Sequence, residues 1–122
     1  MAIAQPFSPI TVVETAAFLR SAGAVLDDVE RELLVHYLAY NPTAGDLVPG
    51  AGGLRKLRWR MEGRGKRGGA RVIYYFHDLT IPLFALAAYA KNEKSDLGPA
   101  ERNDLKRFIA KMISDYQQRK KP

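Results

Sequence analysis

The sequence predicts an α+β fold in which helices pack on one face of a small antiparallel sheet of about four strands. Three observations predict it. A short β-branched run opens the chain, two stretches with helical periodicity follow, and three strand-like stretches precede a last helical one. With 122 residues and no internal repeat, residues 1–122 fit a single domain, with a loose tail over 1–8 and a frayed basic end over 117–122.

The first half of the chain predicts one strand and two helices. Ile10–Glu14 is rich in β-branched residues, which favour a strand. Thr15 is suited to cap a helix over Ala16–Ala22. Asp27, followed three residues later by a glutamate, predicts the capping box of a second, longer helix, which ends before Pro42. A loop rich in glycine and proline then leads to the next strand.

The second half predicts three strands and the last helix. Leu54–Met61 and Ala70–His77 have period-two character and flank a glycine-rich loop, as in a hairpin. Ile81–Ala90 is continuously apolar, which suits an interior strand covered on both faces. Pro99 is suited to the first position of a helix. The apolar stripe expected on that helix is Leu105, Phe108, Ile109, Met112, Ile113 and Tyr116.

The positive charge of the chain is concentrated in the predicted hairpin. The formal net charge is +6, from 19 basic and 13 acidic residues. Eight of the basic residues and one acid lie within Ala51–Tyr75, while the rest of the chain carries 11 basic and 12 acidic residues. The hairpin therefore predicts a local site for a polyanion, either nucleic acid or an anionic membrane surface.

Composition narrows the function classes further. The chain has no cysteine and two histidines, so we expect no disulfide framework, no thiolate or histidine-rich metal site and no cofactor. A reducing cytoplasm is the natural location. The longest apolar run is far shorter than the roughly 20 residues of a membrane-spanning helix, and no signal peptide pattern opens the chain, so no membrane role is expected.

The alternation of a strand predicts which cations share a face. Lys56 and Arg58 are two residues apart and should lie together, while Leu57 and Trp59 point into the core. Arg71 begins the second strand of the hairpin on a face that we expect to be exposed. Cleaving RNA without a metal requires a base, an acid and a cationic clamp for the phosphate, and lysine and arginine supply all three. Clustered cations favour the neutral form of a lysine, so one lysine can act as the base.

Three blocks of the sequence together resemble a known family. They are GDLVPGAGGLRKLRW (Gly45–Trp59), GRGKRGGARVIYY (Gly63–Tyr75) and YAKNEKSDL (Tyr89–Leu97), within an element order that extends the match over Ile10–Tyr116. The chain resembles a toxin of the RelE/ParE superfamily from a bacterial type II toxin–antitoxin module, and most closely the HigB branch.

The resemblance implies a ribosome-dependent endoribonuclease that cuts messenger RNA in the decoding site of the 70S ribosome. It also implies a cognate antitoxin of the helix-turn-helix, HigA-like kind, with operator DNA bound only through that antitoxin. The residues that match the catalytic basic positions of the family are Lys56, Arg58, Arg71, Lys91 and Lys94. The residues expected to contact RNA are Arg55, Arg64, Lys66, Arg67 and Tyr75.

The chain departs from the family pattern at one position. Several relatives place a tyrosine shortly after the last basic cluster, where this chain has Asp96-Leu97-Gly98, so no tyrosine acid is assigned there. Two other functions remain open: a ParE-like toxin that binds DNA gyrase and cleaves nothing, and a nucleic-acid-binding module with phosphate contacts alone. The density of lysine and arginine in the three blocks favours the nuclease.

Overall fold

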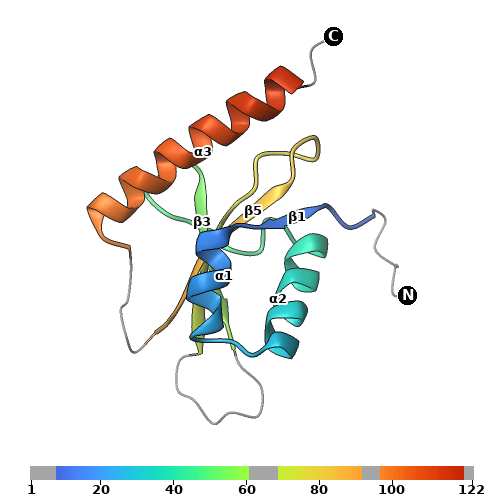
Figure 1. The fold of residues 1–122 in the computed structure, drawn as a ribbon, viewed down its shortest axis with the longest axis vertical. Helices are drawn as coiled ribbons and strands as arrows, with labels where there is room; N and C mark the ends of the chain where they lie inside the picture. Colours follow the sequence, from blue (N-terminus) through green and yellow to red (C-terminus); the bar gives the residue numbers. More distant parts are fainter. Residues whose placement is uncertain (1–7, 61–68, 92–96, 120–122) are drawn as a thin grey trace.

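The protein folds into helices packed on a mostly antiparallel sheet, seen in a computed structural model that describes residues 8–60, 69–91 and 97–119 (Figure 1). In chain order the elements are β1 (Val12–Glu14), α1 (Ala16–Gly23), α2 (Asp28–Tyr40), β2 (Asp46–Leu47), β3 (Leu54–Trp59), β4 (Ala70–Tyr75), β5 (Leu83–Ala90) and α3 (Pro99–Arg119). The predicted α+β class and the order of the main elements are confirmed.

The sheet has one strand more than predicted. Its order is β1-β5-β4-β3-β2, with β1 parallel to β5 and the other pairs antiparallel. The additional strand is β2, which forms because Asp46 and Leu47 pair with Lys56 and Arg55 on β3. The apolar strand β5 is interior, as its composition predicts, although it begins at Leu83 rather than Ile81.

The helices cover both faces of the sheet, so the prediction of helices on one face is wrong. One core joins α1 and α2 to the sheet through residues such as Phe18, Leu34 and Tyr74. A second core on the other face joins α3 to residues such as Ile73 and Phe84. The physical reason lies in β4, the central strand, whose apolar residues alternate between the two faces and are all buried. We refer to these faces as the α1–α2 face and the α3 face.

Both predicted helix caps are present. The Thr15 hydroxyl accepts a hydrogen bond from Phe18 N at 3.1 Å and donates one to Ala85 O at 2.8 Å, which ties the start of α1 to β5. The Asp27 carboxylate accepts from Glu30 N at 2.8 Å. Each cap satisfies a backbone N–H that the first turn of a helix cannot pair.

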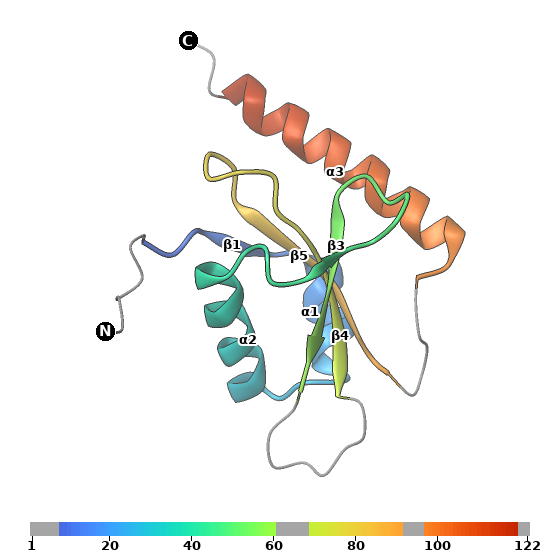
Figure 2. The ribbon, with the colours of Figure 1, turned by 180° about the vertical axis from the view of Figure 1, so that it is seen from behind.

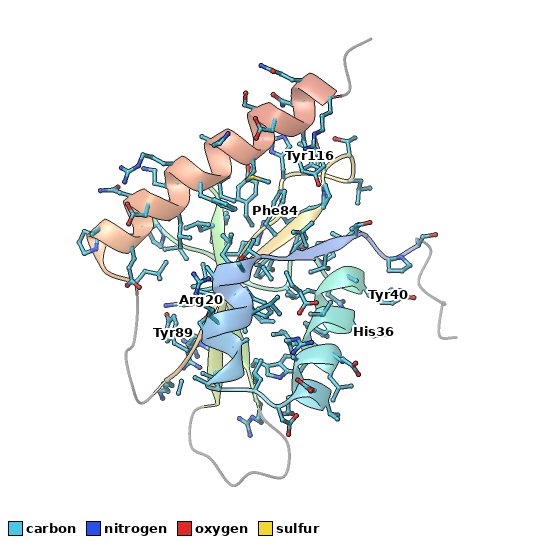
Figure 3. The ribbon with its side chains drawn as sticks, in the orientation of Figure 1. Arg20, His36, Tyr40, Phe84, Tyr89 and Tyr116 are labelled. Carbon is cyan, nitrogen blue, oxygen red and sulfur yellow. The ribbon has the colours of Figure 1, made fainter. Side chains whose placement is uncertain are left out.

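The last helix is longer than expected. It runs to Arg119, so residues 117–119, predicted to fray, are helical, while 120–122 lie outside the described residues. Ile109 is buried and the Tyr116 ring meets Phe84 with centroids 5.8 Å apart (Figure 3), whereas Phe108 is 38% exposed and leaves the predicted stripe. No helix in the described part of the chain is both long and apolar enough to span a bilayer.

The helix α3 crosses one end of the molecule, and the strands of the β3–β4 hairpin point toward the opposite end (Figure 1). Seen from behind, β3 and β4 lie in front of α1, and the lower part of these strands extends beyond α3 (Figure 2). The end of the sheet remote from α3 is therefore where side chains of the α3 face lie beyond the cover of that helix.

Candidate functional site

The strand β3 separates its cations from its apolar residues, as predicted. Leu57 and Trp59 pack into the core of the α1–α2 face. Because neighbouring residues of a strand point to opposite faces, Lys56 and Arg58 lie on the α3 face. Leu54, two residues before Lys56, belongs to the α3-side core, which fixes this assignment.

The sheet register brings Arg58 and Arg71 together. Arg58 on β3 lies directly opposite Arg71 on β4, and Arg71 lies directly opposite Tyr89 on β5. Residues paired in this way have Cα atoms about 4.5–5.5 Å apart and point to the same face. Lys56 lies opposite Ile73, in the next pair of residues that points to the same face. We call Lys56, Arg58 and Arg71 the cationic patch.

The members of the patch differ in exposure. Arg58 is exposed and Lys56 is half-buried. Arg71 is only 8% exposed, so the expectation of an exposed Arg71 is wrong: the residue lies on the central strand, between two neighbouring strands. Its Nη1 donates to Ala70 O at 3.3 Å. Two arginines at paired positions on one face concentrate positive charge there, which suits the binding of an anion.

Gly69 lies beside the patch, where the ends of β3 and β4 approach each other closely. Gly69 has φ +59°, and a Cβ at this position would lie 2.3 Å from Trp59 O, so no side chain fits between the ends of β3 and β4. Gly69 O also accepts a hydrogen bond from Lys91 N at 3.2 Å. This contact places Lys91, which is exposed, next to the first residues of β4. Lys91 is thus near the end of the sheet that carries Arg71.

Several predicted site residues lie outside the described part of the chain. Lys94, from the predicted catalytic set, is one of them. The others are the predicted RNA contacts Arg64, Lys66 and Arg67 of the hairpin loop. Their roles stay predictions from the sequence.

Arg55 belongs to the opposite face and serves the structure there. Its Nη1 donates to Gly45 O at 2.7 Å and to Thr43 O at 3.4 Å. Beside it, the Tyr74 hydroxyl accepts from Gly45 N and donates to Pro42 O, both at 2.8 Å. Burial raises the pKa of Tyr74 above its usual value of 10.0, outweighing the hydrogen bond from Gly45 and the nearby Arg55, which act in the opposite direction. Arg55 therefore holds the loop before β2 and lies apart from the cationic patch.

Tyr75 is also held by the fold. It is 7% exposed, packs in the core of the α3 face, and its hydroxyl lies 3.1 Å from Nδ1 of His77. Burial raises its pKa, and the Asp78 carboxylate adds to the effect. Its ring packs in this core and stacks on the His77 ring, so the fold does not support Tyr75 as a residue that stacks on an RNA base.

Two residues at the patch were missed by sequence reasoning. Tyr89, 6% exposed, flanks Arg71 on the β5 side, and Asp46 lies opposite Lys56 on β2. The alternation of side chains along β5 could have indicated which face of the sheet Tyr89 occupies. Its pairing with Arg71 could not be predicted in this way, because it depends on a register shift near Ile73 and Tyr74. Among the described residues, no group of three or more histidines and carboxylates is placed to hold a metal ion.

Comparison with known proteins gives a fold relationship. No protein-family model matches the sequence. The structure is similar to that of the toxin RelE of E. coli, solved in the free state as a mutant with two arginines replaced by alanine, with a TM-score of 0.51 and 16% sequence identity. The match covers 71% of this chain and 88% of RelE. At this identity the comparison establishes a RelE-like fold.

Proposed function

We propose that this chain is the toxin of a type II toxin–antitoxin module, of the HigB branch, and that it cleaves messenger RNA on the 70S ribosome. The observation that carries the proposal is the cationic patch, in which strand register places Lys56, Arg58 and Arg71 on one face of the sheet. The RelE-like fold and the three sequence blocks support it. A toxin that only binds DNA gyrase has no need for cations gathered in this way.

The proposed reaction is attack by a ribose 2′-hydroxyl on the adjacent phosphorus. A lysine amine takes the 2′ proton, the 2′-oxygen bonds to phosphorus, and the bond to the 5′-oxygen breaks as that oxygen receives a proton. The products are a 2′,3′-cyclic phosphate and a 5′-hydroxyl end. No cofactor takes part, because proton transfer and charge stabilisation are both within the chemistry of lysine and arginine.

The patch suggests a division of roles. Arg71 is buried and fixed on the central strand, so it suits the clamp on the phosphate as charge grows in the transition state. Arg58 is exposed beside it and suits the approach and orientation of the RNA backbone. The lysines Lys56, Lys91 and Lys94 are the candidates for proton transfer. The ribosome would hold the message in place over the patch.

The proposed partners are the ribosome with its messenger RNA and a HigA-like antitoxin that alone contacts operator DNA. We propose that an acidic segment of this antitoxin lies near the hairpin, because carboxylates relieve repulsion among its cations. Reversing the charge of Arg64, Lys66 and Arg67 should then slow association at low salt. Unchanged affinity and on-rate would place the antitoxin elsewhere. A ribosomal target places the protein in the cytoplasm.

The test of the nuclease is primer extension on messages from cells in which the chain is induced. Codon-positioned breaks that appear within minutes, with a halt in incorporation of labelled amino acids, are the expected result. Lys56→Ala should remove the breaks, because it deletes an amine proposed for proton transfer. Lys56 is half-buried on the face that carries the cationic patch. The matched control is Lys111→Ala, which removes an exposed lysine of α3 that pairs with Asp115. Intact messages accompanied by DNA damage would instead support gyrase poisoning.

A further inference from the structure

The helix α2 is apolar on its outer side as well as its inner side. Leu34 and Leu38 are fully buried against the sheet. Val29, Leu33 and Tyr37 recur every four residues along the other side and are 66%, 53% and 39% exposed. Single exposed apolar residues are common in soluble proteins, but a stripe of three along one helix is a surface suited to contact.

This stripe borders an open groove between α2 and the end of β3. The groove has a volume of about 660 Å³ and is lined by Glu30, Leu33, His36, Tyr37, Tyr40, Asn41, Trp59 and Arg60. The rings of Tyr37 and Trp59 meet across it with centroids 5.7 Å apart. His36 and Tyr40 lie side by side on α2, 4.9 Å apart (Figure 3). Aromatic side chains of this kind dominate the energetics of protein interfaces.

Two residues of the groove lining carry buried polar atoms that are unsatisfied. Glu30 is 7% exposed, and its Oε2 has no hydrogen-bond partner among the described residues. The same is true of the buried indole nitrogen Nε1 of Trp59. Buried polar atoms without a partner are rare in folded proteins, and a buried carboxylate without a paired cation makes its surroundings favourable to positive charge.

Acidic residues also lie at the start of α2, outside the lining of the groove. Asp27, Asp28 and Glu32 are exposed there, and the nearby cation Arg31 is already held by Glu14 at 3.0 Å and Asp28 at 3.1 Å. The lining itself carries one acid and one strong cation, Glu30 and Arg60. This lining lacks the excess of cations that binds a phosphate backbone, so its aromatic rings are poorly suited to RNA. The cationic patch lies on the other face of the sheet.

We propose that this groove docks a polypeptide segment of a partner protein, with apolar side chains seated on Leu33, Tyr37 and Trp59 and a lysine or arginine directed toward Glu30. An amphipathic helix with basic residues beside its apolar stripe has this chemistry. The groove is open and its lining follows α2 from Glu30 to Asn41, which suits a segment of chain better than a small molecule. The proposal stands independently of the nuclease site, because none of the patch residues lines the groove.

The test uses the fluorescence of Trp59, the single tryptophan of the chain. Two synthetic amphipathic peptides share one leucine stripe and differ in carrying lysine or glutamate beside it. Titrated into the 122-residue protein, the lysine peptide should change the Trp59 emission with saturation and bind at least about tenfold more tightly than the glutamate peptide. Equal binding, tighter binding of the glutamate peptide, or no change with either would overturn the proposal.

Variants locate the binding and exclude other occupants. Leu33→Asp changes an exposed position, and it should abolish the response to the lysine peptide, while Glu30→Gln should narrow the difference between the two peptides. Lys111→Ala is the control and should change neither. If the peptide response survives in Leu33→Asp, the segment does not bind in the groove. Self-association of the protein that Leu33→Asp removes, or an RNA oligonucleotide that competes with the peptide at this site, would also contradict a peptide-binding groove.

Discussion

The two faces of the sheet use the same residue types for different purposes. On the α1–α2 face, Arg55 of β3 donates to the backbone oxygens of Gly45 and Thr43 and holds a loop in place. On the α3 face, three residues along the same strand, Arg58 lies exposed beside Arg71. The face to which an arginine points, and not the number of arginines on the strand, therefore separates structural cations from candidate catalytic ones.

The largest expected effect comes from Arg71. Arg71→Gln keeps a hydrogen-bonding side chain of similar length but removes the charge, and it should lower the rate of cleavage on programmed ribosomes by on the order of a hundredfold or more. Because Arg71 is buried, the melting temperature of the variant must be measured alongside the rate. A folded Arg71→Gln protein that cleaves at the normal rate would remove this residue from the site.

Arg55 provides the converse test. Arg55→Ala deletes the donor to Gly45 O and should reduce the free energy of unfolding by about 1–3 kcal/mol, while cleavage per folded molecule stays close to normal. Urea unfolding and ribosomal cleavage of the same preparation separate the two effects. Loss of cleavage at unchanged stability would mean that Arg55 contacts the RNA and that the two faces do not divide as described.

The neighbouring Tyr74 adds a dependence on pH. Burial raises its pKa above 10.0, so the folded state keeps the phenol proton more strongly than the unfolded chain does. The stability from this preference is fully present below pH 10 and is lost as pH rises through the pKa of the folded state. The urea midpoint of the wild type should therefore fall above pH 10, and Tyr74→Phe, though less stable at neutral pH, should show a smaller fall.

A residual pH dependence is expected in that variant, because burial also raises the pKa of Tyr75. The additional variant Tyr75→Phe should flatten the profile further. A slope that is identical in wild type and Tyr74→Phe would show that Tyr74 titrates alike in the folded and unfolded states.

The smallest effect is expected at Tyr89. Its hydroxyl oxygen is buried, so we expect that the hydroxyl does not contact the RNA. The ring is expected to support Arg71 by packing against it. Tyr89→Phe should change the cleavage rate by no more than a few fold, whereas Tyr89→Ala should disturb the neighbouring strand and lower stability. A loss in Tyr89→Phe comparable to that of Arg71→Gln would make the hydroxyl a catalytic group.

The sequence predicted the faces of β3 well, because period two is a local property of a strand. Lys56 and Arg58 on one face, with Leu57 and Trp59 on the other, required no knowledge of the remaining chain. The caps Thr15 and Asp27 were likewise predicted from residues a few positions apart. Local patterns thus account for the parts of the site that come from one strand.

The assembly of the site across strands could not be predicted in the same way. Arg71 faces Arg58 through the register of the whole hairpin, at whose end Gly69 leaves no room for a side chain, and Tyr89 joins them through a register shift on β5. The second helical layer was missed for a related reason. The composition of Ile81–Ala90 already suited a strand covered on both faces, but the apolar run of β4 indicates two cores only once that strand is known to be central.

The most direct test of the central claim is the chemistry of the ends of cleaved messages. RNA from ribosomes incubated with the purified wild-type protein is treated with polynucleotide kinase and ligated to adapters, in parallel with untreated RNA. The account predicts 5′-hydroxyl ends, which ligate only after phosphorylation, together with 2′,3′-cyclic phosphates, and their absence with Arg71→Gln. Ends that carry a 5′-phosphate, or cleavage that Arg71→Gln leaves unchanged, would contradict it.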